Sequence, residues 1–334
     1  MASRELYYPR TSNEGLQRPF RAAKGGPPIE FIFSEHLPPD EAGLQLGADA
    51  ATAIPWFRYL NQDPIAEAVI VEAGIGPGTQ IYGLLREHAS LSDRYPQKWL
   101  QGPIKIIGFD NEESAVDQAQ VNLARWQSEE TFPPFSFEVF YGDWRNERTY
   151  DKILELAPDG ATEVIANPGF YPTEEGLAQI QRGYEGLPHD VLYGGRDGLQ
   201  GFVDFIPHMP RILTRRPGAG LMFRYGKTYD SVPFDPLPDE YFSTINPAGD
   251  KRLYQLHPSD GYEERELTRV IHTHFDRAGL RHSLRFLHGI RGIPRLSSFV
   301  SQLQRPYDPE DISTHQLLDS MMGDAKELMR TDVA

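Results

Sequence analysis

One acidic residue and three glycines follow an apolar run of this chain. Residues 68–71 lead into Glu72 and then into Gly74, Gly76 and Gly78. Glycines let the backbone turn sharply and approach a ligand closely. A carboxylate before such a turn can accept hydrogen bonds from hydroxyl or ammonium groups. The stretch therefore predicts a site for a small ligand that carries hydroxyls or an amine.

Polar residues also follow three later apolar runs. They are Asp110 after 104–109, Asp143 after 135–141 and Asn167 after 163–166. A single acid at such a place is often only a helix cap. Four polar residues in succession point to a shared site, because the carboxyl ends of parallel strands lie along one edge of the sheet.

The elements that must position these residues alternate along the chain. Apolar, β-branched runs predict strands and 3.6-residue patterns predict helices, which together favour a doubly wound, mostly parallel α/β sheet. The expected strands are 68–72, 104–109, 135–141, 163–166, 220–225 and 282–287. The expected helices are 48–60, one from 79, 114–126, 151–156, 198–213, 263–278 and 311–329.

Composition divides the chain into four parts. Residues 1–60 are expected to form an N-terminal extension or lid, and residues 61–226 the ligand-binding core. Residues 227–261, rich in Pro, Asp and Tyr, are expected to form an insertion or cap outside the sheet. Residues 262–334 are expected to complete the fold and add a final helix.

Charge and composition restrict the partners. The formal net charge of -15 over 334 residues argues against a nucleic-acid partner, whose phosphates require Lys and Arg. No apolar run approaches the length of a membrane span, and we expect a cytoplasmic protein that can form homo-oligomers. There is no cysteine, hence no thiol nucleophile. His272 and His274 lie two apart on an expected helix and face different sides, so no metal site is predicted.

Two kinds of nucleotide site compete for the glycine-rich stretch. A dinucleotide site would feed a pyrophosphate onto a helix N-terminus, whereas an acid before the first glycine suits a ligand without phosphate. A tight turn with no ligand is the third possibility. The pattern E-x-G-x-G-x-G at Glu72–Gly78 resembles the first motif of class I S-adenosylmethionine-dependent methyltransferases.

This resemblance covers about residues 65–226 and implies a seven-stranded Rossmann-like methyltransferase fold with S-adenosyl-L-methionine as cofactor. It implies that Glu72 and the glycine turn hold the amino-acid end and that Asp110 accepts from the ribose hydroxyls. Asp143 would meet the adenine amino group, with Asn111 and Trp144 beside the ring. The implied cofactor-binding set is Glu72, Gly74, Gly76, Gly78, Asp110, Asn111, Asp143 and Trp144.

Asn167-Pro168-Gly169-Phe170 resembles the N-P-P-Y motif of methyltransferases that modify planar or amide nitrogen. With Pro172 and Gly194-Gly195-Arg196-Asp197-Gly198-Leu199, it is most similar to the release-factor glutamine methyltransferases. It departs from their pattern at Gly169 and Phe170. The resemblance implies that Asn167 orients the nucleophile. Aromatic rings would surround the sulfonium; the candidates are Phe170, Tyr171 and Tyr141.

Three functions follow. The first is methyl transfer to a nitrogen of a small molecule or peptide, with secondary metabolism as the expected setting. The second is intramolecular attack by the cofactor's own amine, which yields azetidine-2-carboxylate and methylthioadenosine. The third is a non-catalytic binding module that has kept the fold.

Overall fold

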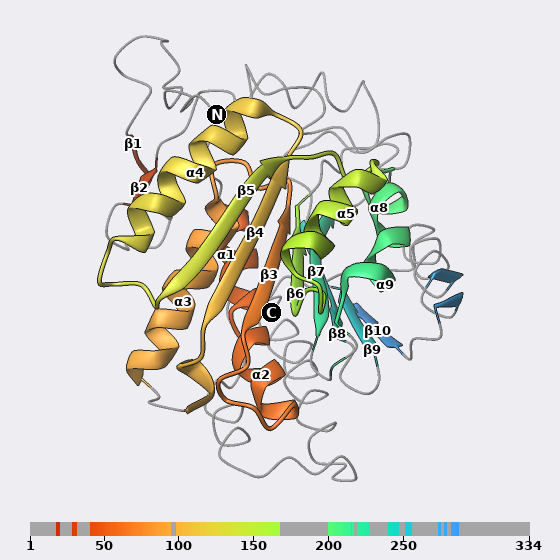
Figure 1. Cartoon of the computed structure of the whole chain (residues 1–334), viewed down its shortest axis with the longest axis horizontal. Helices are drawn as coiled ribbons and strands as arrows, with labels where there is room; N and C mark the ends of the chain where they lie inside the picture. Colours follow the sequence, from red (N-terminus) through yellow and green to blue (C-terminus); the bar gives the residue numbers. More distant parts are fainter. Residues whose placement is uncertain are drawn as a thin grey trace, which may run out of the picture.

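The computed structural model describes about half of the chain, centred on a mixed β-sheet (Figure 1). The described residues are 18–20, 29–31, 41–94, 98–167, 200–214, 216, 219–226, 240–246, 251–255, 273–274, 277–278 and 282–286. Several residues of the predicted site lie outside them, namely Phe170, Tyr171 and the segment 194–199. The expected helix 311–329 lies outside them as well.

The main sheet has eight strands in the order β10-β9-β8-β7-β6-β3-β4-β5. Their bounds are β3 (Ala68–Ala73), β4 (Ile104–Asp110), β5 (Phe135–Tyr141), β6 (Glu163–Ala166), β7 (Gly220–Gly226), β8 (Glu240–Asn246), β9 (Lys251–Gln255) and β10 (His282–Phe286). Strands β5, β4, β3, β6 and β7 are mutually parallel. The order reverses between β3 and β6, and in open α/β sheets ligands bind at such a switch point.

The sheet differs from the prediction beyond β7, where β8, β9 and β10 lie. We predicted seven strands and an insertion at 227–261, but β8 and β9 lie within that range and extend the sheet. β8 pairs antiparallel with both β7 and β9, and β10 pairs parallel with β9, where a final strand was predicted. The prolines of this region flank β8 instead of interrupting it, which is why a composition-based argument missed the strand. A separate antiparallel pair joins β1 (Arg18–Phe20) to β2 (Ile29–Phe31).

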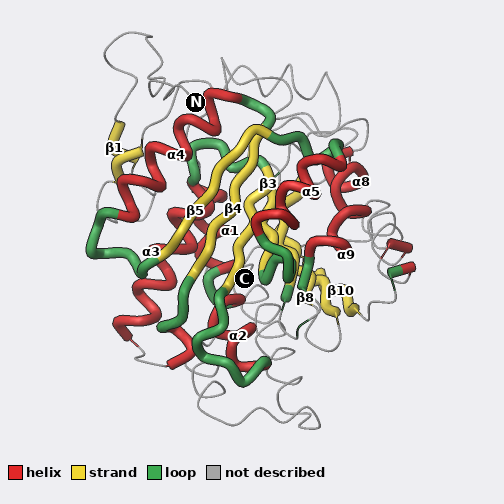
Figure 2. The backbone as a smooth tube through the Cα atoms, in the orientation of Figure 1, coloured by secondary structure: helices red, strands yellow, loops and turns green. Residues whose placement is uncertain are grey.

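Helices cover both faces of the sheet (Figure 2). Their bounds are α1 (Glu41–Ala50), α2 (Ala53–Leu60), α3 (Thr79–Arg94), α4 (Glu113–Gln127), α5 (Glu147–Leu156), α8 (Gln200–Phe205) and α9 (Met209–Ile212), with 3-10 turns η1 (Lys98–Leu100) and η2 (Ile206–His208). One core cluster joins the strands to α1, α3 and α4, and a second joins them to α5, α8, η2 and α9. The predicted helix 198–213 is broken into short pieces, as Pro207 and Pro210 led us to expect. None of the helices in the described ranges is long and apolar enough to cross a bilayer.

Arg58 links α2 to the chain segments that lead into β3 and β4. Its side chain is fully buried, and its guanidinium donates to the main-chain oxygens of Ala66, Trp99 and Pro103 at 2.9, 3.0 and 2.6 Å. Burial lowers the pKa of Arg58 to about 10, against the opposing charge of Asp63. These three carbonyls lie just before β3 and β4, so one side chain fixes where both strands begin.

Helices α1 and α3 touch backbone to backbone. A Cβ added to Gly47 of α1 would lie within 3.0 Å of three backbone atoms of Gln80, among them its carbonyl oxygen, and one added to Gly83 of α3 would overlap the carbonyl oxygen of Leu44. Because Gln80 belongs to the first turn of α3, α1 packs directly against the helix that follows the glycine turn.

Gly47→Ala is therefore expected to destabilise the fold, by about 1–3 kcal/mol through overpacking. In an unobstructed helix, Gly→Ala stabilises by roughly 0.5–1 kcal/mol, so the sign of the change is diagnostic. Urea unfolding measures it, and Gly83→Ala should change stability in the same direction. A more stable Gly47→Ala protein would show that the two helices are not in backbone contact.

His88 lies on the buried face of α3. It continues the buried stripe of Ile81, Leu84 and Leu85, and neither ring nitrogen has a hydrogen-bond partner among the described residues. Burial, together with the positive charge of Arg58, lowers the pKa of His88 to about 3. The folded protein therefore holds this imidazole neutral.

This pKa predicts a loss of stability in acid. Below pH 6.5 the unfolded chain takes up a proton at His88 that the folded chain does not bind until about pH 3, so the stability falls as the pH is lowered across that window. His88→Leu removes this contribution. Between pH 7.5 and pH 5.0, the difference in unfolding free energy between the two proteins should move about 2 kcal/mol in favour of the variant. Urea unfolding at both pH values tests this, and equal pH dependence in both proteins would contradict it.

Candidate functional site

The turn between β3 and α3 uses its own N–H groups within the protein. Gly74 N and Ile75 N both donate to the carbonyl oxygen of Phe109, at 2.9 and 3.1 Å, and Gly78 N donates to the Ile75 oxygen at 2.8 Å. Gly76 N donates to the Asp110 carboxylate. Pro77 has no N–H. The five residues 74–78 therefore keep no main-chain donor for an anionic ligand.

The three glycines of the turn all have left-handed backbone. Their φ angles are 73° at Gly74, 51° at Gly76 and 88° at Gly78, a region that L side chains seldom adopt. A Cβ added to Gly76 would meet no atom of the described residues within 4 Å, whereas one added to Gly74 would reach the ring of Trp144 at 3.5 Å. Among the described residues, the space beside Gly76 is therefore open to the turn.

Asp110 closes β4 directly beside this turn. Its Oδ2 accepts from Gly76 N at 2.9 Å and its Oδ1 accepts from Glu112 N at 3.0 Å. Burial raises the pKa of Asp110, and the two N–H bonds offset only part of that effect. Each oxygen has a second lone pair, so the carboxylate can still accept from a ligand hydroxyl.

Asp143 and Trp144 follow β5 and lie on the other side of Asp110. Gly142 N donates to the Asp110 carbonyl oxygen at 2.9 Å, which holds the start of this loop. The ring of Trp144 packs against the core, and its carbonyl oxygen accepts from the Tyr150 hydroxyl at 2.5 Å. The carboxyl ends of β4 and β5 are thus neighbours in the sheet.

The Asp143 carboxylate is already engaged by Arg145. The guanidinium of Arg145 donates to both oxygens, at 2.9 to 3.2 Å, and Arg145 N donates to Oδ1 at 2.8 Å. Partial burial raises the pKa of Asp143, but the bonds from Arg145 outweigh it and leave the pKa lowered. A ligand amine at Asp143 would share this carboxylate with Arg145.

The other predicted residues lie at varied depths. Glu72 is completely buried in β3, where it is paired with Gly108 of β4. Asn111 is exposed, and Tyr141 is 62% exposed at the end of β5. Asn167 follows β6, next to the pair Ala73–Ala166; its Oδ1 is buried and has no hydrogen-bond partner among the described residues.

Sequence reasoning missed two residues that shape the turn. A Cβ at Gly108 would lie 2.2 Å from Cδ1 of Ile75, so this glycine makes room for the turn's one large apolar side chain. Asn122 of α4 is buried, and its Nδ2 donates to the Pro77 oxygen at 2.8 Å. A glycine inside a β-branched strand and an asparagine on an apolar helix face were the available signals.

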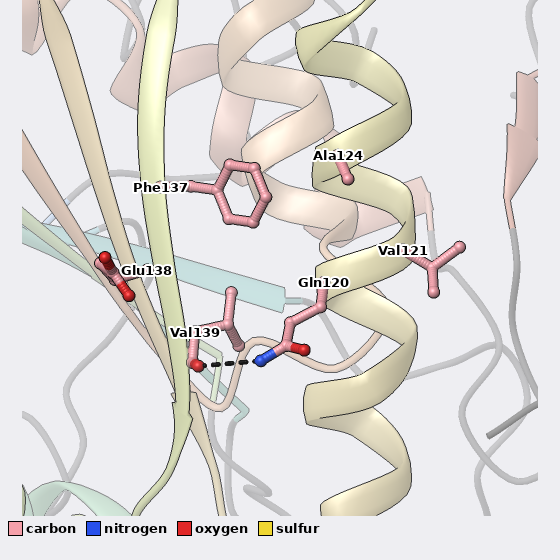
Figure 3. Close-up of a pocket in the computed structure, with 6 residues that line it drawn as sticks. All are labelled: Gln120, Val121, Ala124, Phe137, Glu138 and Val139. Atoms are coloured by element: carbon pink, nitrogen blue, oxygen red, sulfur yellow. Dashed lines mark hydrogen bonds between the residues drawn. The ribbon is translucent and has the colours of Figure 1, made fainter. Parts of the chain in front are cut away.

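A surface hollow lies between α4 and the edge strand β5 (Figure 3). Within it, Gln120 Nε2 donates to the Val139 oxygen at 3.1 Å. Farther along the same helix, Gln127 Nε2 donates to the Phe135 oxygen at 2.7 Å. The hollow is lined by Gln120, Val121, Ala124, Phe137, Glu138 and Val139. These residues belong to the outer edge of the sheet, and none of them forms part of the glycine turn.

No protein-family model and no curated protein matches the chain. Among solved structures, it matches a Listeria monocytogenes protein assigned to the class I S-adenosylmethionine-dependent methyltransferases at 10% identity and TM-score 0.38, over 83% of this chain and 74% of that one. It matches the CcbJ methyltransferase of Streptomyces caelestis at 14% identity and TM-score 0.31, over 67% and 83%. It matches the plantazolicin methyltransferase BpumL, solved with SAH, at 11% and 0.30, over 55% and 48%, so the match spans about half of that relative.

Asp110→Asn tests the bond between carboxylate and turn. The new NH₂ group must face either Gly76 N–H or Glu112 N–H, so one buried donor loses its acceptor, at a cost of about 1–3 kcal/mol. Urea unfolding should show this loss, whereas Asn111→Ala, at the exposed neighbour, should change stability by less than about 0.5 kcal/mol. An Asp110→Asn protein as stable as the wild type would contradict the bonding described here.

Proposed function

We propose that the chain is an S-adenosylmethionine-dependent methyltransferase that transfers the methyl group to a nitrogen of a small molecule or peptide. The observation that carries this proposal is the use of donors and acceptors at the turn. The N–H groups of residues 74–78 are used within the protein, while the Asp110 carboxylate accepts from Gly76 N–H, beside a space that no described residue fills. The site offers acceptors to its ligand.

A dinucleotide fits this arrangement poorly. Its pyrophosphate needs free N–H donors in the glycine turn, and it would meet the Asp110 carboxylate with like charge. S-adenosylmethionine has no phosphate and carries a positive sulfonium, an ammonium group and two ribose hydroxyls. Each of these groups is attracted to carboxylate or carbonyl oxygens.

The chain's own residues have distinct proposed roles. Asp110 accepts from the ribose hydroxyls, and the open space at Gly76 admits the ligand to van der Waals contact with the backbone. Trp144 offers an apolar face to the adenine, while Asp143 accepts from its amino group. Glu72 acts on the amino-acid end, and Asn111 flanks the adenine.

Asn167 is proposed to orient the methyl acceptor. Its buried Oδ1, which has no hydrogen-bond partner among the described residues, follows β6 at the switch point of the sheet, where a substrate N–H could donate to it. A planar or amide nitrogen bound in this way presents its lone pair in line with the sulfonium methyl, so positioning supplies most of the catalysis. Phe170, Tyr171 and Tyr141 are the proposed aromatic neighbours of the sulfonium.

The composition of the chain supports the remaining proposals, which concern the substrate class and the location of the protein. An acidic chain with net charge -15 suits a small-molecule or peptide substrate better than a nucleic acid. We propose a cytoplasmic enzyme, and no metal ion is needed for the transfer.

Calorimetry with S-adenosylmethionine tests cofactor binding. The wild type should bind with micromolar affinity, and Asp110→Ala should weaken binding at least 100-fold, because it removes the acceptor for both ribose hydroxyls. Asn111→Ala is the matched control at the exposed neighbouring position and should bind nearly as tightly as the wild type. Absence of binding by the folded wild type would contradict the proposal.

The nucleoside by-product tests the reaction. Incubation with S-adenosylmethionine and cell extract should yield adenosylhomocysteine by mass spectrometry, and Asn167→Ala should reduce its rate with little change in cofactor affinity. Methylthioadenosine formed without extract would instead show that the enzyme cyclises the cofactor.

A further inference from the structure

Helix α4 contacts the glycine turn through two residues on one face. Asn122 is fully buried, and its Nδ2 donates to the Pro77 oxygen at 2.8 Å. Trp126 lies four residues later, so it shares that face of the helix. Its ring would lie 3.3 Å from a Cβ at Gly78. The turn therefore packs on α4 at two successive residues.

The peptide group between Pro77 and Gly78 is held at both ends. Its carbonyl oxygen accepts from Asn122, and its N–H donates to the Ile75 oxygen at 2.8 Å. The preceding residue, Gly76, is held by Asp110. Because Gly76 and Gly78 have left-handed backbone that glycine enters and leaves at little cost, these bonds decide which conformation the turn keeps.

We propose that Asn122 is a positioning residue for the cofactor turn, which rests on the proposed function above. Asn122 fixes the Pro77–Gly78 peptide so that the space beside Gly76 stays open to S-adenosylmethionine. It touches neither the cofactor nor the substrate. Its loss weakens cofactor binding through a less ordered turn and leaves the chemical step of bound cofactor nearly unchanged.

The test compares Asn122→Leu with Gln120→Leu. Both replace a side-chain amide on α4 that donates to a main-chain oxygen, but Gln120 bonds to Val139 on the edge strand, away from the turn (Figure 3). A loss of stability alone would affect both variants. An effect on the glycine turn is expected in Asn122→Leu only, and this difference distinguishes the two variants.

The first readout needs no ligand. In hydrogen exchange followed by mass spectrometry, the peptide that contains residues 74–79 should exchange at least ten-fold faster in Asn122→Leu than in the wild type. Gln120→Leu should leave the exchange of that peptide unchanged. Should Asn122→Leu fail to fold, Asn122→Ala takes its place with the same readouts.

The second readout is affinity and turnover at a temperature well below the unfolding midpoint. Asn122→Leu should raise the Kd for S-adenosylmethionine ten-fold or more, with kcat at saturating cofactor within about three-fold of the wild type. Gln120→Leu should change neither quantity by more than two-fold.

Three outcomes would overturn the proposal. They are unchanged exchange at the turn, a cofactor Kd within two-fold of the wild type, and equal effects of the two variants. If the wild type does not bind S-adenosylmethionine, the proposed function fails, and the exchange of residues 74–79 still decides whether Asn122 holds the turn.

Discussion

The hydrogen bond from Gly76 N–H to the Asp110 carboxylate joins the ends of two neighbouring strands. It fixes the turn after β3 relative to the end of β4, and Asp110 in turn holds the loop after β5 through Gly142. Through its carboxylate and its main-chain oxygen, the single residue Asp110 thus sets the relative positions of three connections at the carboxyl ends of the strands. The N–H groups of the turn donate to acceptors within the protein. The hydrogen bonds that build the turn therefore leave acceptors, and not donors, for a ligand.

The central strands could be predicted from the sequence because each is a continuous apolar run. β5 and β6 have the predicted bounds. Helix α4 begins one residue before the predicted helix 114–126 and ends one residue after it. The strand β8 could not be predicted in the same way, because prolines on both sides obscured a short β-branched and aromatic segment. Residue pairs distant in sequence were also out of reach. Gly108 is explained only by Ile75, which lies on the neighbouring turn.

The candidate site shows the same limit. A sequence places acids at strand ends, and the structure brings Asp110, the glycine turn and Trp144 together. The sequence alone does not reveal which hydrogen-bond or ionic partner a side chain has. Asp143 pairs with Arg145, two residues away, and Glu72 lies fully buried. The helices that cover the sheet pack through contacts such as that of Gly47 with Gln80, which no local pattern reveals.

Gln120 and Gln127 of α4 have a consequence for self-association. β5 is the outer strand of the main sheet, and such a strand offers unpaired carbonyls to a strand from another molecule. Gln120 and Gln127 already occupy the Val139 and Phe135 oxygens. An incoming strand would have to displace both amides before it could pair, so the helix that supports the turn also shields the sheet from lateral growth into aggregates.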